Sequence, residues 1–255
     1  LSLTSRAFYS DVLGSFLEQV TTTFGYDKFL PMNTGVEGGD TAVKLARRWA
    51  YDVKGVPDGE AVVLFAKGAF WGRSLAAVSS STDPEAFGGF GPFMPGFEVV
   101  EYDDLDALEA AMQRHAGRVA AFMVEPIQGE AGVVVPQQGY LARAKEICEK
   151  HQALLIADEV QTGLGRCGAM LCSEPVRPDL VVLGKALSGG LYPVSGVLAD
   201  NDIMLTIQPG QHGSTYGGNP LGAAVASEAL RVLEEEQLPQ RAQHLGAILR
   251  DELSQ

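Results

Sequence analysis

Six short runs of almost purely apolar residues recur along the chain, and polar segments separate them. Runs without the alternation of a half-exposed strand are typical of strands buried on both faces of a sheet. Strands that alternate with amphipathic helices indicate an α/β fold with a mostly parallel sheet, which binds ligands at the carboxyl ends of its strands. The predicted strands are residues 61–66, 97–102, 119–124, 153–157, 180–183 and 194–199, and the predicted helices between or before them are residues 40–53, 104–114 and 139–151.

The last third of the chain is predicted to be helical. Residues 219–236 are rich in Ala, Leu, Glu and Val, and Pro220 lies near the start, where a helix tolerates proline. Pro239 interrupts the pattern, and a second helix is predicted over residues 240–253. The chain opens at residues 1–4 without methionine, on what we interpret as the approach to a helix. We therefore interpret the chain as an internal part of a longer protein.

Composition narrows the class of protein. The 255 residues are 46% hydrophobic and carry a formal net charge of −13, which argues against nucleic acid or an anionic membrane surface as a partner. No run approaches the roughly 20 apolar residues of a membrane-spanning helix. The three cysteines, an odd number without metal-ligand spacing, predict reduced thiols and no metal site. These features favour a plain enzyme, and they do not choose between the cytoplasm and the mitochondrial matrix.

Lys185 is the most informative single residue. It follows the predicted strand 180–183 and stands among glycines, an unusual place for an ammonium group that is costly to desolvate. A desolvated lysine loses its proton more easily and becomes a nucleophile toward aldehydes. Pyridoxal phosphate is a cofactor that uses such a lysine, together with an acidic partner at its ring nitrogen. Asp158, at the end of the predicted strand 153–157, is the candidate for that partner.

The segment 34–41 is a weaker candidate for an anion site. Its small residues let backbone amides approach an anion, and the amino end of the helix that follows adds partial positive charge. The alternative is that Asp40 and Thr41 simply cap this helix. The long Ser-, Gly- and Pro-rich segment 79–96 predicts an ordered loop, which in a compact domain is usually functional.

Further candidates follow the predicted strands. Phe70 could stack on a planar cofactor and Arg73 could grip a carboxylate, although for this motif in isolation core packing and a surface arginine are the favoured explanation. Glu125 and Glu130 could serve acid–base chemistry or neutralise cations, or could be solvated loop residues. The polar segment 212–219 leads into a helix, and its hydroxyls could bind phosphate. A tight turn with an ordinary helix cap explains the segment equally well. His212 is interpreted as structural.

In combination these segments are far more specific than any one of them. The run from Leu155 through Asp158 to Gly163, followed by Gly184–Lys185 and Gly189–Gly190, resembles the signature of class III pyridoxal-phosphate aminotransferases. Within that class the chain is most similar to the ornithine aminotransferases. Further segments that carry the resemblance are residues 31–37, 70–73, 79–84, 89–97, 125–130 and 212–217.

The resemblance implies roles for the residues around the cofactor. Lys185 would form the Schiff base with pyridoxal phosphate and later move the proton at the substrate carbon, and Asp158 would keep the pyridine nitrogen protonated. The other implied cofactor contacts are Gln161 at the phenolic oxygen, Phe70 against the ring, and the amides of Gly35 and Val36 at the phosphate.

The resemblance also implies partners. Ser214 and Thr215 would bind the phosphate of a second subunit's cofactor, which makes the active unit a homodimer. The implied substrates are L-ornithine and 2-oxoglutarate. The implied substrate-binding residues are Arg73, which binds a carboxylate, Trp71, Glu125, which supports the site, and Glu130, which covers an arginine that the family carries nearer its carboxyl end.

The implied fold is that of the large domain of fold-type I pyridoxal-phosphate enzymes over residues 1–238, with residues 239–255 as the start of a small carboxyl-terminal domain. The implied reaction transfers the δ-amino group of L-ornithine to 2-oxoglutarate and gives glutamate 5-semialdehyde and glutamate. The alternatives are another ω-aminotransferase of the acetylornithine or 4-aminobutyrate type, and a non-catalytic protein that only binds the cofactor.

Overall fold

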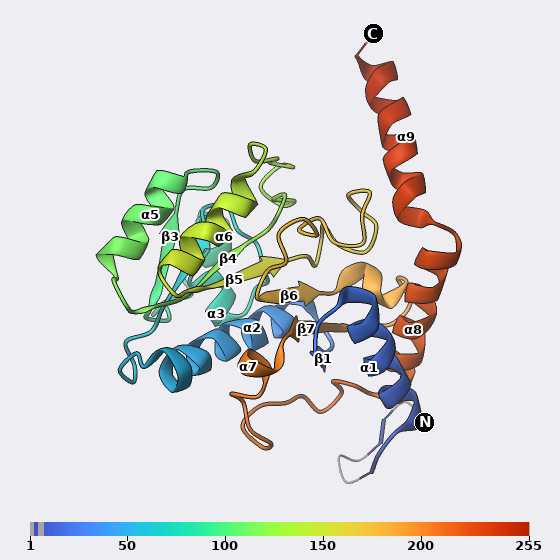
Figure 1. Ribbon diagram of the computed structural model, residues 1–255, viewed down its shortest axis with the longest axis horizontal. Coiled ribbons are helices and arrows are strands. Elements are labelled where there is room, and N and C mark those ends of the chain that lie inside the picture. Colours follow the sequence, from blue (N-terminus) through green and yellow to red (C-terminus); the bar gives the residue numbers. More distant parts are fainter. Residues whose placement is uncertain (1–2, 5–7, 255) are drawn as a thin grey trace.

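The computed structural model describes residues 3–4 and 8–254. Its centre is a seven-stranded sheet in the order β1-β7-β6-β5-β4-β2-β3 (Figure 1). The strands β2 to β6 run parallel to one another, whereas β7 runs antiparallel to β6 and to β1. The bounds are β1 Lys28–Met32, β2 Val62–Ala66, β3 Phe97–Val100, β4 Val119–Val124, β5 Leu154–Asp158, β6 Leu180–Leu183 and β7 Ser195–Ala199.

Helices cover both faces of this sheet (Figure 1). The long helices are α1 Asp11–Phe24, α2 Gly35–Trp49, α5 Leu105–Arg114, α6 Tyr140–Lys150, α8 Pro220–Glu235 and α9 Leu238–Leu253, and one π-helical turn, η1 Ala50–Lys54, continues α2. The short elements are α3 Leu75–Val78, α4 Pro84–Phe87, the 3₁₀ turn η2 Lys185–Ser188 and α7 Asn201–Met204. Within the described part of the chain, no helix is long and apolar enough to cross a membrane.

The two-residue period of the strands divides the core into layers. Val63 and Phe65 of β2 face α2, while Val62 and Leu64 face the cluster that α5 and α6 complete. At the other end of the sheet, α1 and α8 pack on β6 and β7, for example against Val181. Because both faces are covered, every residue of the central strands β2, β4, β5 and β6 is buried, as their unbroken apolar sequences predict.

All six predicted strands are present, with ends within two residues of the prediction. The predicted helices at 104–114, 139–151, 219–236 and 240–253 are also confirmed as α5, α6, α8 and α9. The predicted helix 40–53 begins earlier, at Gly35, and the predicted loop 79–96 contains the short helix α4. Of the residues 1–4 interpreted as a helix approach, Leu1 and Ser2 lie outside the described residues, and the other two are not helical.

Sequence analysis did not predict β1 or α1. The strand β1 lies at the edge of the sheet and contains Pro31, which lacks an N–H for the ladder and is tolerated only where a strand has a free edge. Its burial is also mixed, so its sequence lacks the continuous apolar run of the central strands.

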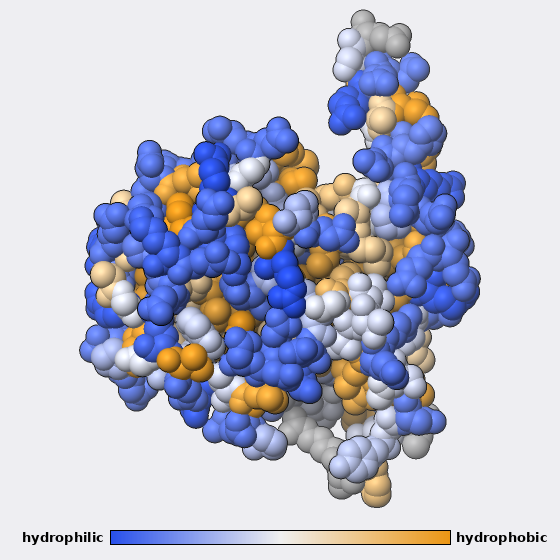
Figure 2. All heavy atoms as spheres, viewed as in Figure 1, coloured by the Kyte–Doolittle hydropathy of each residue, from blue (hydrophilic) through white to orange (hydrophobic). Residues whose placement is uncertain are grey.

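The helix α9 extends away from the body of the molecule (Figure 1). The space-filling view shows mainly hydrophilic residues over α5, α6 and α9, with apolar patches on the projecting helix (Figure 2). Leu245, Ile248, Leu249 and Leu253 of this helix are exposed. The chain changes direction at Gln237, between α8 and α9. A domain boundary at residues 238–239 stays a prediction.

Close packing of α2 on the sheet depends on a glycine. A Cβ atom at Gly38 would lie 2.8 Å from Cγ1 of Val182 in β6, so a larger residue would push the helix away from the strand. We expect Gly38→Ala to lower the free energy of unfolding by about 1–3 kcal/mol, measured by urea denaturation. The control is Gly14→Ala in α1, where no atom lies within 4 Å of the added carbon and where we expect a gain of roughly 0.5–1 kcal/mol. Equal effects at both positions would contradict this account of the packing.

Candidate active site

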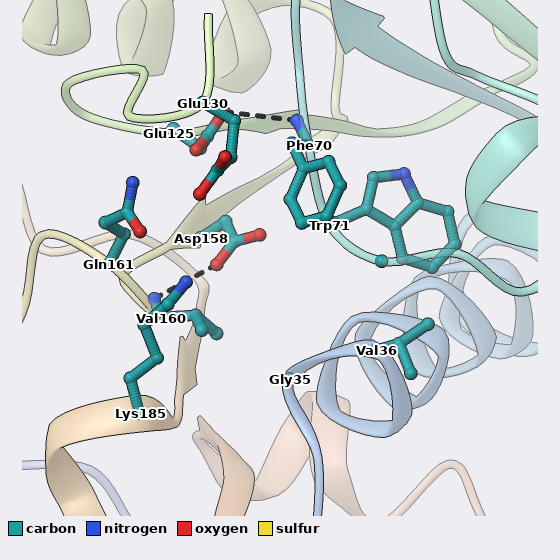
Figure 3. Close-up of a pocket in the computed structure, with 11 residues that line it drawn as sticks. Gly35, Val36, Phe70, Trp71, Glu125, Glu130, Asp158, Val160, Gln161 and Lys185 are labelled. Carbon is teal, nitrogen blue, oxygen red and sulfur yellow. Dashed lines mark hydrogen bonds between the residues drawn. The ribbon is translucent and has the colours of Figure 1, made fainter. Parts of the chain in front are cut away.

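A cavity of about 270 Å³ lies at the carboxyl ends of the central strands. The segments that follow β2, β4, β5 and β6 meet there, and the amino end of α2 closes one side (Figure 3). Its lining residues are Gly35, Val36, Phe70, Trp71, Gly72, Glu125, Glu130, Asp158, Val160, Gln161 and Lys185. The fold therefore brings together nine of the twelve residues that the sequence predicted as site residues, at the edge where a parallel sheet binds ligands. Arg73, Ser214 and Thr215 are not among the lining residues.

Asp158 is the last residue of β5 and is buried. Its Oδ1 accepts a hydrogen bond of 3.0 Å from the backbone N–H of Val160. Burial raises the pKa of this carboxyl to about 7, against the lowering effects of that bond and of the positive charge of Lys185. Among the described residues, no lysine, arginine or histidine forms an ion pair with Asp158. A cation that entered the cavity would thus relieve a buried charge.

Lys185 begins the 3₁₀ turn η2 directly after β6, and its side chain reaches toward Asp158 (Figure 3). Its φ of 42° lies in the left-handed region, a conformation that costs a non-glycine residue about 1–3 kcal/mol and is typical of functional sites. The sequence predicts a desolvated amine, and this structure does not show one. The side chain is exposed, because it extends into the cavity instead of packing within the core.

Glu125 follows β4 and is a second buried carboxylate. Its Oε2 accepts a hydrogen bond of 3.3 Å from the backbone N–H of Phe70 (Figure 3). Burial, and then the nearby charge of Asp158, raise the pKa of Glu125 to about 8. Glu130, five residues later, is exposed, and its carboxylate points into the cavity (Figure 3). Among the described residues, no lysine or arginine forms an ion pair with Glu130.

Gln161 lies beside the cavity, and its position depends on a neighbouring glycine. A Cβ atom at Gly129 would lie 1.5 Å from Nε2 of Gln161, so a larger residue there would displace this side chain from its position. Val160 also lines the cavity and packs against the start of α2, where a Cβ at Gly35 would lie 3.1 Å from its Cγ1. Sequence reasoning missed Gly129 and Val160 as site residues. Their proximity to Asp158 and Glu125 in the sequence was the available signal.

Three side chains of the segment 70–73, those of Phe70, Trp71 and Arg73, have different surroundings. The ring of Phe70 borders the cavity (Figure 3), and the guanidinium of Arg73 lies 5.7 Å from the centroid of that ring. Arg73 is exposed and is not among the lining residues. The indole of Trp71 stacks on Phe65 at 5.7 Å within the core, and its Nε1–H donates to Oγ of Ser80 at 2.8 Å. This packing does not support a substrate contact by the Trp71 ring, and that role stays a prediction.

The amino end of α2 is built to leave backbone amides available at the cavity. Thr34 caps the helix, and its side chain and that of Glu37 exchange hydrogen bonds with each other's backbone N–H groups. The alternative that Asp40 and Thr41 cap the helix is wrong, because both lie inside it. Gly72 lies against this first turn, since a Cβ there would meet Val36 at 2.4 Å.

Ser214 and Thr215 do not line this cavity. They lie in the segment between α7 and α8, beside residues 8–10 and 13–14 near the start of α1. Oγ of Ser214 accepts hydrogen bonds from Nδ2 of Asn33 at 2.9 Å and from the N–H of Gly217 at 3.2 Å. Thr215 is exposed. In the described chain, no group of three His, Cys, Asp or Glu side chains is arranged to hold a metal ion.

Comparison with known proteins places this geometry in a family. The family model described as aminotransferase class-III matches residues 1–255. The chain belongs to this family, whose members depend on pyridoxal phosphate and share the mostly parallel sheet of fold type I.

Individual relatives are similar over nearly the whole chain. Mitochondrial ornithine aminotransferase of Rattus norvegicus is 65% identical over 255 residues, which are 99% of this chain and 58% of the relative. A solved structure of the ornithine aminotransferase of Toxoplasma gondii, with pyridoxal phosphate at partial occupancy in its active site, is 52% identical with a TM-score of 0.97, covering 99% of this chain and 59% of that one. Acetylornithine aminotransferase of Elizabethkingia anophelis is 48% identical with a TM-score of 0.87, covering 100% and 60%. The chain thus spans about three fifths of the length of these relatives.

The described residues fit pyridoxal phosphate. The cavity offers a buried carboxylate for a protonated ring nitrogen, an amine for an aldehyde, and the first turn of a 15-residue helix for a phosphate. Phe70 and Val160 supply apolar surface for a planar ring. Replacing Gly35 or Gly72 by a larger residue would bring side-chain atoms against Val160 or Val36 at this same place.

The raised pKa of Glu125 makes stability depend on pH. In the unfolded chain this carboxyl titrates near its ordinary value of 4.5, and in the folded protein near 8. Between these pH values the folded state binds this proton more tightly than the unfolded chain does. The stabilisation that the protonated Glu125 carboxyl contributes to the free energy of unfolding is therefore lost as the pH rises from about 5 to 8. We expect the free energy of unfolding of cofactor-free Glu125→Gln to fall less than that of wild type between pH 5 and pH 8, by on the order of 2 kcal/mol. Urea denaturation at both pH values measures this difference. Glu101→Gln, on the surface, should follow wild type; equal pH dependence in all three proteins would contradict the assignment.

Proposed function

We propose that this protein is a pyridoxal-phosphate-dependent ornithine aminotransferase. It transfers the δ-amino group of L-ornithine to 2-oxoglutarate, giving glutamate 5-semialdehyde and glutamate. The observation that carries this proposal is the approach of the Lys185 amine toward the buried carboxylate of Asp158 across a cavity that fits the cofactor. The names of the rat and Toxoplasma relatives support the choice of ornithine.

The residues around the cavity would divide the work of holding the cofactor. When bound, pyridoxal phosphate supplies an electron-withdrawing ring that accepts the electron pair left on the substrate carbon. Asp158, whose burial makes its charge costly, keeps the ring nitrogen protonated. Lys185 holds the cofactor's aldehyde carbon and afterwards takes and returns the proton at the substrate carbon. The other residues that would hold the cofactor are Phe70 and Val160, which offer apolar surface to the ring, Gln161 for its phenolic oxygen, and the amides of Gly35 and Val36 for the phosphate.

The active unit in this proposal is a homodimer. Ser214 and Thr215 lie outside the cavity of their own chain, and Thr215 is exposed. These positions suit residues that contact the phosphate in a second subunit. The compartment, cytoplasm or mitochondrial matrix, stays a prediction; the rat relative is named as mitochondrial.

Substrate recognition in this proposal uses charge. Arg73, exposed beside Phe70, binds a substrate carboxylate bidentately. Glu125 supports the site from its buried position. Glu130 points into the cavity and there pairs with an arginine when ornithine is the substrate, then releases it for the second carboxylate of 2-oxoglutarate.

One alternative is transfer from acetylornithine, which the similarity to the Elizabethkingia enzyme supports, and a screen of amino donors distinguishes the two. A non-catalytic role is disfavoured because Lys185 and Asp158 are both present.

Lys185→Ala is the central test. Loss of a covalent anchor and of the general base should lower turnover by roughly three orders of magnitude or more, measured with ornithine and 2-oxoglutarate in the protein that carries this chain. The cofactor is still expected to bind through its phosphate contacts. The matched control is Lys67→Ala, which removes a surface lysine that pairs with Glu101. Near-normal turnover in Lys185→Ala would remove the proposal, as would failure of borohydride to fix the cofactor at Lys185 in wild type.

Glu130→Ala tests the choice of ornithine. The substitution leaves the paired arginine permanently available, which favours a second carboxylate and disfavours ornithine. We expect the rate ratio of the ornithine to the glutamate half-reaction to fall at least about tenfold, the effect of losing one charge-assisted pair. Stopped-flow measurement of both half-reactions gives this ratio.

The control for this experiment is Glu101→Ala, which removes an exposed carboxylate remote from the cavity and should leave the ratio unchanged. An unchanged ratio in Glu130→Ala would eliminate the gating role. A fall of both half-reactions by the same factor would instead make Glu130 a general support of the site.

A further inference from the structure

The segment between α7 and α8, residues 205–219, is attached to α2 at two points. The first is at the start of the helix, where Nδ2 of Asn33 donates to Oγ of Ser214 at 2.9 Å and to Oε1 of Glu37 at 3.2 Å. Glu37 is also the carboxylate of the capping box with Thr34. The same polar group therefore shapes the first turn of α2 and holds Ser214.

The second attachment is His212, which bonds α2 with both ring nitrogens. Nε2 lies 2.8 Å from Oγ1 of Thr41, and Nδ1 lies 2.8 Å from Nζ of Lys44. An ammonium group can only donate, so Nδ1 is the acceptor and the proton resides on Nε2. The Nε2–H then donates to Thr41, whose hydroxyl donates to the carbonyl of Glu37 at 2.7 Å. The direction of every bond in this chain requires a neutral imidazole.

We propose that His212 is a positioning residue, which by bonding Thr41 and Lys44 holds the 205–219 segment, and with it Ser214 and Thr215, against the helix whose amino end receives the cofactor phosphate. This inference rests on the proposed function for the roles of Ser214 and Thr215. The attachment of His212 to Thr41 and Lys44 is a property of the structure and does not depend on that function. His212 lies two residues before Ser214, so loss of its two bonds removes the hydrogen bonds that hold this stretch to Thr41 and Lys44 of α2 and leaves those of Ser214.

The electrostatic surroundings favour the neutral ring. Burial, and then the positive charge of Lys44, lower the pKa of His212 below its ordinary value of 6.5, while Asp40 acts in the opposite direction. In the described chain, Lys44 and Asp40 of α2 are the charged groups that act on the ring. Because the folded-state pKa is lowered, the stabilisation by this attachment is present above about pH 6.5 and is lost as the pH falls through the folded-state value.

The test compares His212→Phe, which keeps a ring but no hydrogen bonds, with His212→Gln, whose amide can still donate to Thr41. Hydrogen exchange of the amides of residues 209–218 is measured without cofactor, and the dissociation constant of pyridoxal phosphate is measured at pH 7.5. We expect His212→Phe to raise the exchange rate of these amides and the dissociation constant of pyridoxal phosphate about tenfold each. This factor corresponds to the loss of one net hydrogen bond of ordinary strength or slightly more. His212→Gln should recover most of both effects. The matched control is His244→Phe at an exposed position of α9, which should change neither.

Lys44→Met provides a second route if His212→Phe fails to fold, because Lys44 is exposed and contributes one of the two bonds. It should raise loop exchange and the dissociation constant by a few-fold. Unchanged exchange in both variants would overturn the proposal, and so would raised exchange with unchanged cofactor affinity, or a Gln variant that behaves like the Phe variant. Failure of the proposed function is distinguishable, because wild type would then show no saturable cofactor binding while the exchange measurement still tests the attachment.

Discussion

The burial of Asp158 at the end of β5 is the constraint on which the site depends. A carboxylate in this position is costly unless a cation or hydrogen-bond donors compensate it, and the protein itself supplies one backbone N–H at 3.0 Å. The sheet order places β4 and β6 on either side of β5, so Glu125 and Lys185 flank the same carboxylate. Burial raises the pKa of both acids, so a cation that enters the cavity would favour their ionised forms, which suits a protonated ring nitrogen and an amino substrate.

The helix α2 supplies the opposite electrostatic character. Its amino end is brought to the cavity by close packing on β6, which Gly38 permits, and by a hydrogen bond of 2.6 Å from Oγ of Ser195 in β7 to the carbonyl of Thr34. The capping box of Thr34 and Glu37 fixes the first turn. The partial positive charge of the helix end and the acids Glu125 and Asp158 thus border the same cavity of about 270 Å³. A ligand with a phosphate at one end and a cationic nitrogen at the other matches this pattern.

Prediction from sequence succeeded for the central strands because burial on both faces demands unbroken apolar runs. It failed for β1, whose edge position tolerates Pro31 and mixed exposure, and it placed the start of α2 five residues late. The glycines at 35, 38 and 39 resemble a loop when considered alone. They lie inside a helix, and they are glycines because Val160, Val182 and Trp71 lie too close for side chains there, a reason that exists only in the folded protein.

The sequence by itself determined six of the seven strands of the sheet and the helices that follow them, the location of Asp158 and Lys185 at strand ends, and the family resemblance that joins them. These depend on local patterns, because a strand end and the residue after it are neighbours along the chain. The tertiary structure alone decided which side chains share the cavity. It turned the indole of Trp71 into the core, left Lys185 exposed, fitted Gln161 against Gly129 and joined His212 to Thr41. Each of these outcomes depends on distances between backbones that packing, and not chain order, establishes.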